Sequence, residues 1–171
     1  MTTQIRRLDF DNDEEVYVAA SFSMLTLLES LPEARRKPDS VPNFSIEEMA
    51  KMYRGGRHHP DHRYYVAEAE GGLIVGHAIA LMRTEEDGTR YGYSYTRYIL
   101  PTHRRQGLAR RLLREAKGWW RSQGAAHVLA HTHTSNAPLL ALFESEGFSV
   151  VERRDGRWPS LQLRCPNGAL A

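Results

Sequence analysis

The sequence predicts an α/β (α+β) fold in which helices cover a β-sheet within one domain, residues 1–171. The length of 171 residues corresponds to about one domain, and a hydrophobic content of 41% is enough for one sizeable core. The second half alternates strand-like and helix-like segments in a β-α-β-α-β pattern, which is typical of helices packed on a sheet. The chain shows no internal repeat and no linker that would divide it.

The first third of the chain is expected to contain one strand and two helices. The predicted order is a strand at 5–8, a helix from Val16 to Leu31, a loop at 32–44 and a short helix that closes at Gly55-Gly56. Pro32 ends the first helix, because proline disfavours helical geometry in the residue before it. Ser45 and Glu48 fit a capping box, which opens the second helix.

The rest of the chain alternates between strand and helix periodicity. Three strands are predicted at 63–69, 73–82 and 91–100, with turns at Gly71-Gly72 and Asp87-Gly88. After Pro101 the predicted order is a helix at 107–123, a strand at 127–134, a helix capped by Ser135 or Asn136, and strands at 148–153 and 160–164.

Composition excludes several classes of protein. The net charge of +2, from 23 basic and 21 acidic residues, does not suggest a general nucleic-acid binder. A single cysteine, Cys165, rules out an internal disulfide framework and a cysteine-rich zinc site. His58, His59 and His62 are loosely spaced in a loop-like segment, so we predict solvated side chains and no metal site.

The N-terminus lacks the apolar run of a signal peptide, and no apolar stretch approaches the ~20 residues of a membrane span. We therefore expect a cytoplasmic protein with no nucleic-acid or membrane partner.

The most informative segment is a basic loop between a strand and a helix, residues 99–110. Backbone N–H groups and the helix dipole at such a helix start bind anions. Gly107 lets the backbone approach a ligand closely, and the small side chain of Ala109 avoids a clash with a phosphate. The chain has neither the P-loop pattern nor the dinucleotide fingerprint. These observations predict a pyrophosphate cradle of another type.

Two sequence blocks resemble the GNAT superfamily, the acyl-CoA-dependent N-acyltransferases. Residues 104–109, Arg-Arg-Gln-Gly-Leu-Ala, match the family's [QR]-x-x-G-x-[GA] loop. Residues 136–148 resemble its N-x-x-A-x-x-x-[YF]-x-x-x-G-F segment, with Leu139 where alanine is common. Each motif is weak alone, but both occur at the expected spacing and in the expected strand–helix–strand–helix context.

The resemblance implies a single GNAT-like domain with a mixed, mostly antiparallel sheet whose central parallel strands splay apart. Acetyl-CoA, the co-substrate, would lie in that split, here between residues 91–100 and 127–134. The implied cofactor-binding residues are Arg97, Tyr98, Ile99, Arg104, Arg105, Gln106, Gly107, Leu108, Ala109, Arg110, Asn136 and Phe143. Amides of residues 105–110 would hold the pyrophosphate, and basic side chains of the loop would attract the phosphates.

The implied reaction is direct transfer of an acetyl group from acetyl-CoA to a primary amine of a small molecule or peptide. His131 is the candidate catalytic base, because it lies five residues before Asn136, where some members that acetylate protein N-termini carry a glutamate. Many members carry a tyrosine seven residues after the asparagine as the acid for the CoA thiolate. Phe143 occupies that position and has no proton to give.

Two other functions are alternatives to acetyl transfer. The sequence does not identify the amine acceptor. A catalytically degenerate acyl-CoA-binding or sensing module is the alternative, because Phe143 replaces the acid. A nucleic-acid-binding function is third, and the near-neutral charge weakens it. The choice of acceptor is expected to depend on residues 22–45 and on the hairpin after the sixth strand. Aminoglycoside-like amines, polyamines, amino acids and protein N-termini all fit, and a homodimer is a further predicted assembly.

Overall fold

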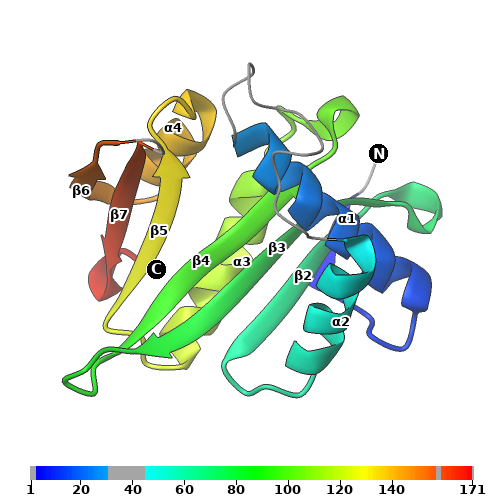
Figure 1. The fold of residues 1–171 in the computed structure, drawn as a ribbon, viewed down its shortest axis with the longest axis horizontal. Helices are drawn as coiled ribbons and strands as arrows, with labels where there is room; N and C mark the ends of the chain where they lie inside the picture. The colour runs from blue at the N-terminus through cyan, green and yellow to red at the C-terminus, as the bar shows by residue number, and fades with distance from the viewer. Residues whose placement is uncertain (1–2, 31–44, 157–158, 171) are drawn as a thin grey trace. The chain divides into compact units, whose positions relative to one another are not determined.

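The computed structural model describes residues 3–30, 45–156 and 159–170 (Figure 1). Its helices are α1 (Asp13–Ser30), α2 (Ile46–Gly56), α3 (Leu108–Ser122) and α4 (Ala137–Ser145). Its strands are β1 (Gln4–Arg7), β2 (His62–Glu68), β3 (Ile74–Thr84), β4 (Arg90–Ile99), β5 (His127–His133), β6 (Ser149–Arg154) and β7 (Ser160–Pro166). Every helix and strand predicted from the sequence is present, with ends shifted by a few residues.

Some local predictions are also confirmed, and one falls outside the described residues. Ser45 and Glu48 form the predicted capping box at the start of α2. Asn136, and not Ser135, caps α4: its side-chain oxygen accepts a hydrogen bond from the Leu139 amide. The predicted loop at 32–44 lies outside the described residues. No helix in the described part of the chain is long and apolar enough to cross a membrane.

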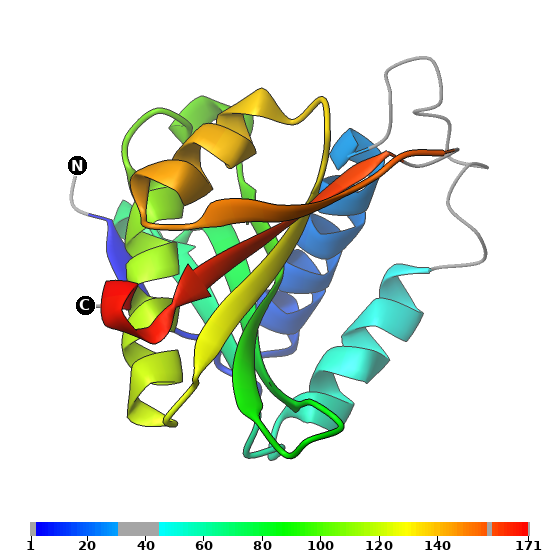
Figure 2. The same cartoon turned by 90° about the vertical axis from the view of Figure 1, so that its left-hand side faces the viewer.

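The seven strands pair in the order β1-β2-β3-β4-β5-β7-β6. β1 pairs antiparallel with β2, and β7 pairs antiparallel with both β5 and β6 (Figure 2). β4 and β5 are parallel, with a register that runs from Gly92 opposite Val128 to Ser94 opposite Ala130. Both strands extend beyond this register. The sheet is therefore mixed, and its parallel pair is central.

Residue contacts divide the chain into two compact units. The first unit comprises Met1–Ile79 and Thr96–Leu112, and the second comprises Ala80–Tyr95 and Leu113–Ala171. Strands β3 and β4 and helix α3 each contribute to both units.

A buried polar cluster joins α1, α2 and β3 in the first unit. The phenol oxygen of Tyr53 lies 2.6 Å from Ser23 Oγ and 3.1 Å from His77 Nδ1, and the phenol donates to the Ala19 carbonyl at 3.1 Å. Burial and the positive charge of Arg97 lower the pKa of His77 to about 3, so its imidazole is neutral at pH 7. The cluster gives partners to Ser23 Oγ, the Tyr53 hydroxyl and His77 Nδ1, which would otherwise be costly to bury, and leaves His77 Nε2 without one among the described residues.

Trp120 anchors α3 to the sheet in the second unit. Its side chain is fully buried, and its indole N–H donates to the Leu81 carbonyl at 2.9 Å. A Cβ atom on Gly92 would lie 2.7 Å from the indole ring and 2.8 Å from Val128 Cγ2. Glycine at position 92 is therefore required by the close packing of α3 on β4.

A second anchor of α3 is the buried carboxylate of Glu146, which follows α4. Arg114 donates to both of its oxygens, at 3.1 and 3.0 Å, and Lys117 Nζ donates to its backbone carbonyl at 3.2 Å. These bonds attach the middle of α3 to the segment between α4 and β6.

Gly92→Ala is expected to lower the free energy of unfolding by about 1–3 kcal/mol, because the added methyl group overpacks the contact with Trp120. The measurement is urea-induced unfolding. Gly118→Ala, within α3, is the matched control: a Cβ atom there meets no heavy atom within 4 Å. That variant should gain about 0.5–1 kcal/mol, because alanine favours helix over glycine. Equal stability of the two variants would contradict this account of Gly92.

Candidate functional site

The loop before α3 has the backbone geometry of an anion-binding turn. A short 3-10 helix, Pro101–His103, follows β4, and the Gly107 carbonyl accepts the first hydrogen bond of α3 from the Arg111 amide at 3.0 Å. Arg105 and Gly107 both adopt left-handed backbone conformations, with φ of 64° and 77°. Such alternation turns successive amides toward one side, and the first amides of a helix have no carbonyl partner within it.

The same loop is open on its outer side. A Cβ atom on Gly107 would meet no heavy atom within 4 Å, and residues Arg105, Gln106 and Arg110 are exposed. Leu108 is buried, so it fixes the helix start to the core. The backbone at Gly107 is therefore held firmly and remains accessible to an anion.

Arg104, which the sequence assigned to the cofactor, already has an anionic partner in the first unit. Its Nη2 group donates to both carboxylate oxygens of Glu29, at 2.9 and 2.8 Å, and its Nε donates to the Ile99 carbonyl at 2.9 Å. The Tyr98 hydroxyl donates to the same carboxylate at 3.1 Å. Arg104 thus ties the loop to the ends of α1 and β4, and Glu29 is the partner that sequence reasoning missed.

The end of β4 carries the other predicted cofactor residues of the first unit. Tyr98 and Ile99 are buried, and burial lowers the pKa of Arg97 to about 10. The Arg97 carbonyl accepts a hydrogen bond from Thr26 Oγ1 at 3.1 Å.

His131 lies on β5 in the second unit, with an exposed side chain. Its Nδ1 atom is 3.2 Å from the hydroxyl oxygen of Tyr93, on β4. Partial burial and Arg154 lower the pKa of His131, with Arg83 acting in the same direction and Glu152 against it. The imidazole is therefore neutral at pH 7, as a proton acceptor must be.

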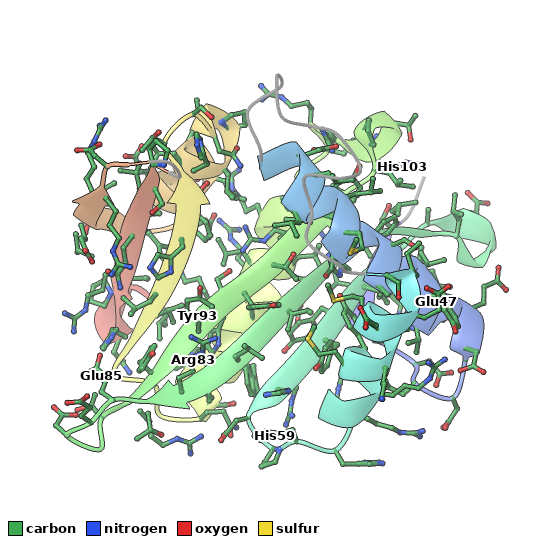
Figure 3. The ribbon with its side chains drawn as sticks, viewed as in Figure 1. Glu47, His59, Arg83, Glu85, Tyr93 and His103 are labelled. Atoms are coloured by element: carbon green, nitrogen blue, oxygen red, sulfur yellow. The ribbon has the colours of Figure 1, made fainter. Side chains whose placement is uncertain are left out.

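The contact with Tyr93 bears on the tautomer of His131. If Nδ1–H donates to the phenol oxygen, the Nε2 lone pair is available to accept a proton. Burial raises the pKa of Tyr93, so its hydroxyl stays protonated. The guanidinium carbon of Arg83 lies 4.0 Å from the centre of the Tyr93 ring, and Figure 3 shows the two side chains over the same part of the sheet.

Two predicted cofactor residues, Asn136 and Phe143, lie in the second unit and contact other residues of that unit. Asn136 caps α4, and Phe143 is buried with its ring centre 4.8 Å from that of Phe148. Their contacts with the cofactor stay predictions. Among the described residues, no group of three or more histidine, cysteine, aspartate or glutamate side chains is arranged to hold a metal ion.

Curated proteins of similar sequence are acetyltransferases. The chain is 30% identical over 120 residues to the acetyltransferase GW6a of Oryza sativa subsp. japonica, a match over 63% of this chain and 29% of that protein. It is 31% identical over 98 residues to the L-methionine sulfoximine/L-methionine sulfone acetyltransferase of Salmonella typhimurium, over 54% of this chain and 57% of that protein. The matches thus span less than two thirds of these relatives.

Solved structures show the same fold. The acetyltransferase yncA of Salmonella typhimurium, solved with acetyl-CoA, has a TM-score of 0.74 at 19% identity and covers 98% of this chain and 95% of its own. A chain of the NatC complex, bound to Gag peptide and CoA, has a TM-score of 0.73 at 18% identity, over 97% of this chain and 99% of its own. The sequence model of the acetyltransferase (GNAT) family matches residues 25–148. The chain therefore belongs to the GNAT family of acetyltransferases.

Proposed function

We propose that this protein is an acetyl-CoA-dependent N-acetyltransferase that acts on a primary amine of a small molecule or peptide. The observation that carries the proposal is the open, left-handed turn at Arg105 and Gly107 before α3. Family membership supports it, as do related structures with bound acetyl-CoA or CoA. The predicted cytoplasmic location and homodimer stay predictions.

The turn before α3 fits a pyrophosphate group. Amides of residues 105–110 would donate to its oxygens, and the exposed side chains of Arg105 and Arg110 would balance its charge. Arg104 would act as a positioning residue, because Glu29 already neutralises it. Acetyl-CoA, when bound, supplies the thioester carbonyl that the amine attacks.

His131 would take the proton that the amine must lose. As the C–N bond forms and the C–S bond breaks, the ammonium proton passes to Nε2 of His131, directly or through water. Tyr93 would hold the ring by accepting a hydrogen bond from Nδ1–H. Phe143 cannot donate a proton, so we propose that the thiolate leaves unprotonated or takes its proton from solvent.

The alternative is an acyl-CoA-binding module without catalysis. Both functions need the loop before α3, so cofactor binding alone does not separate them. A neutral histidine held beside Tyr93 favours the enzyme. The deciding test is thiol release from acetyl-CoA in the presence of a mixed panel of amines: a protein that binds CoA and releases no thiol with any amine would be the binding module.

Gly107→Glu is expected to abolish CoA binding, because it places bulk and negative charge where the pyrophosphate would lie. Isothermal titration calorimetry with CoA measures this. Gly124→Glu is the control, since Gly124 also has a left-handed backbone, φ 71°, and open space around its Cβ position. Both variants carry the same backbone strain, so unchanged affinity in Gly107→Glu would remove the proposed cradle.

The pKa of His131 is expected to lie below 6.5 when measured by NMR titration of its ring protons. Arg154→Gln should raise it, because that change removes a nearby positive charge and leaves Glu152 without its partner. Arg153→Gln is the matched control, since Arg153 pairs with Asp155. A pKa that responds equally to both changes would contradict the assigned cause.

His131→Ala is expected to lower kcat/KM by about 10²–10⁴-fold, the usual range for a positioned general base. In the wild type the rate should fall on the acidic side as the imidazole becomes charged, with its midpoint below 6.5 because the pKa is lowered. Affinity for CoA should change little. A variant that keeps the wild-type rate and the same acidic limb would clear His131 of this role.

A further inference from the structure

We propose that Arg83 binds a carboxylate of the acceptor, and that the acceptor is a free α-amino acid. The inference rests on the proposed function and names its substrate class. It is carried by the second unit alone, where one phenol ring, that of Tyr93, contacts both a guanidinium group and the candidate base.

Arg83 lies at the end of β3 with an exposed side chain. Its guanidinium carbon lies 4.0 Å from the centre of the Tyr93 ring, and within the described residues it forms no ion pair. Stacking on an aromatic face holds the guanidinium plane while its N–H groups stay directed outward. A held, planar fork of donors is suited to a carboxylate, which it can bind through two parallel hydrogen bonds.

Two acidic side chains of the second unit contact other residues. Glu85 lies 3.4 Å from His127 Nε2, and Glu152 accepts two hydrogen bonds from Arg154, at 2.8 and 3.1 Å. Within the described residues Arg83 thus has no ion-pair partner, and its guanidinium group can bind an anion from outside the chain. His131, the proposed base, contacts the same Tyr93 side chain as Arg83 does. The amine acceptor must come next to this base, so it is the ligand that can reach Arg83.

The arrangement matches the two charged groups of an amino acid. Arg83 lies over the ring of Tyr93, and His131 contacts the hydroxyl of the same residue. A cation and a proton acceptor therefore flank one tyrosine side chain. An α-amino acid carries its carboxylate and its amine on one carbon atom. A polyamine or an aminoglycoside brings a second positive charge, which Arg83 would repel.

The surface beside this pair is aromatic. Tyr95 is 45% exposed, and its ring centre lies 6.4 Å from that of Tyr93. An apolar amino-acid side chain could rest on this ring while the carboxylate is held by Arg83. Leucine is therefore the first acceptor to test.

The carboxylate also has a predicted effect on the base. Arg83 is one of the charges that lower the pKa of His131. A carboxylate bound to Arg83 compensates that charge, so the pKa of His131 rises when such a ligand binds. This effect gives a readout that does not depend on turnover.

The experiment compares the twenty free amino acids with spermidine, isoamylamine and leucinamide as acceptors of the acetyl group, by thiol release and mass spectrometry of the product. The best amino acid is then compared with its own amide in wild type, Arg83→Gln, Arg83→Lys and the control Arg153→Gln. The ratio of kcat/KM for the acid to that for the amide should fall about 10- to 100-fold in Arg83→Gln, as expected for a lost charged hydrogen bond. The difference in intrinsic reactivity between the two amines cancels when this ratio is compared between wild type and variant.

Arg83→Lys should keep part of the preference, and Arg153→Gln all of it. In NMR titrations, N-acetylleucine should raise the pKa of His131 in the wild type and not in Arg83→Gln. The inference is overturned by an unchanged ratio in Arg83→Gln, or by transfer to spermidine, isoamylamine or leucinamide without transfer to any amino acid. Either result leaves the proposed function standing. If the wild-type protein neither binds CoA nor transfers the acetyl group to any of the amines, the proposed function is overturned as well.

Discussion

The indole of Trp120 occupies the space that a side chain at position 92 would need, and Gly92 is also the first residue of the parallel register of β4 and β5. Because side chains alternate along a strand, the residue after Gly92 directs its side chain to the opposite face of the sheet. Tyr93 therefore lies on the face away from Trp120, where it meets Arg83 and His131. The packing of Trp120 on Gly92 thus fixes which face of the sheet the next residue, Tyr93, occupies.

The elements and the loop before α3 could be predicted because their signals are local. The capping box at Ser45 and Glu48, the glycine that opens α3 and the Asn136 cap each involve residues within a few positions of one another. Local hydrogen bonds of this kind are formed by sequence neighbours in any tertiary context. The family motif at 104–109 is likewise local, because its residues are consecutive in the sequence.

The partners of the site residues could not be predicted, because they depend on the register and packing of distant segments. Tyr93 and His131 are 38 residues apart in sequence, and Arg104 and Glu29 are 75 apart. The sequence showed a basic cluster around the loop, but only packing shows which of those charges is already paired. Arg104, a predicted phosphate-binding residue, is paired with Glu29, whereas Arg83, which no motif includes, has no ion-pair partner among the described residues.

The buried cluster of Ser23, Tyr53 and His77 connects proton uptake to folding. His77 has a pKa of about 3 in the folded chain, whereas a histidine in an unfolded chain titrates near 6.5. Between these values the unfolded chain binds a proton that the folded chain excludes, so the free energy of unfolding falls as the pH drops through this window. The contribution of His77 is fully present above the upper value. A neutral histidine in the core thus makes the folded chain less stable in mild acid, at pH values where most carboxylates are still ionised.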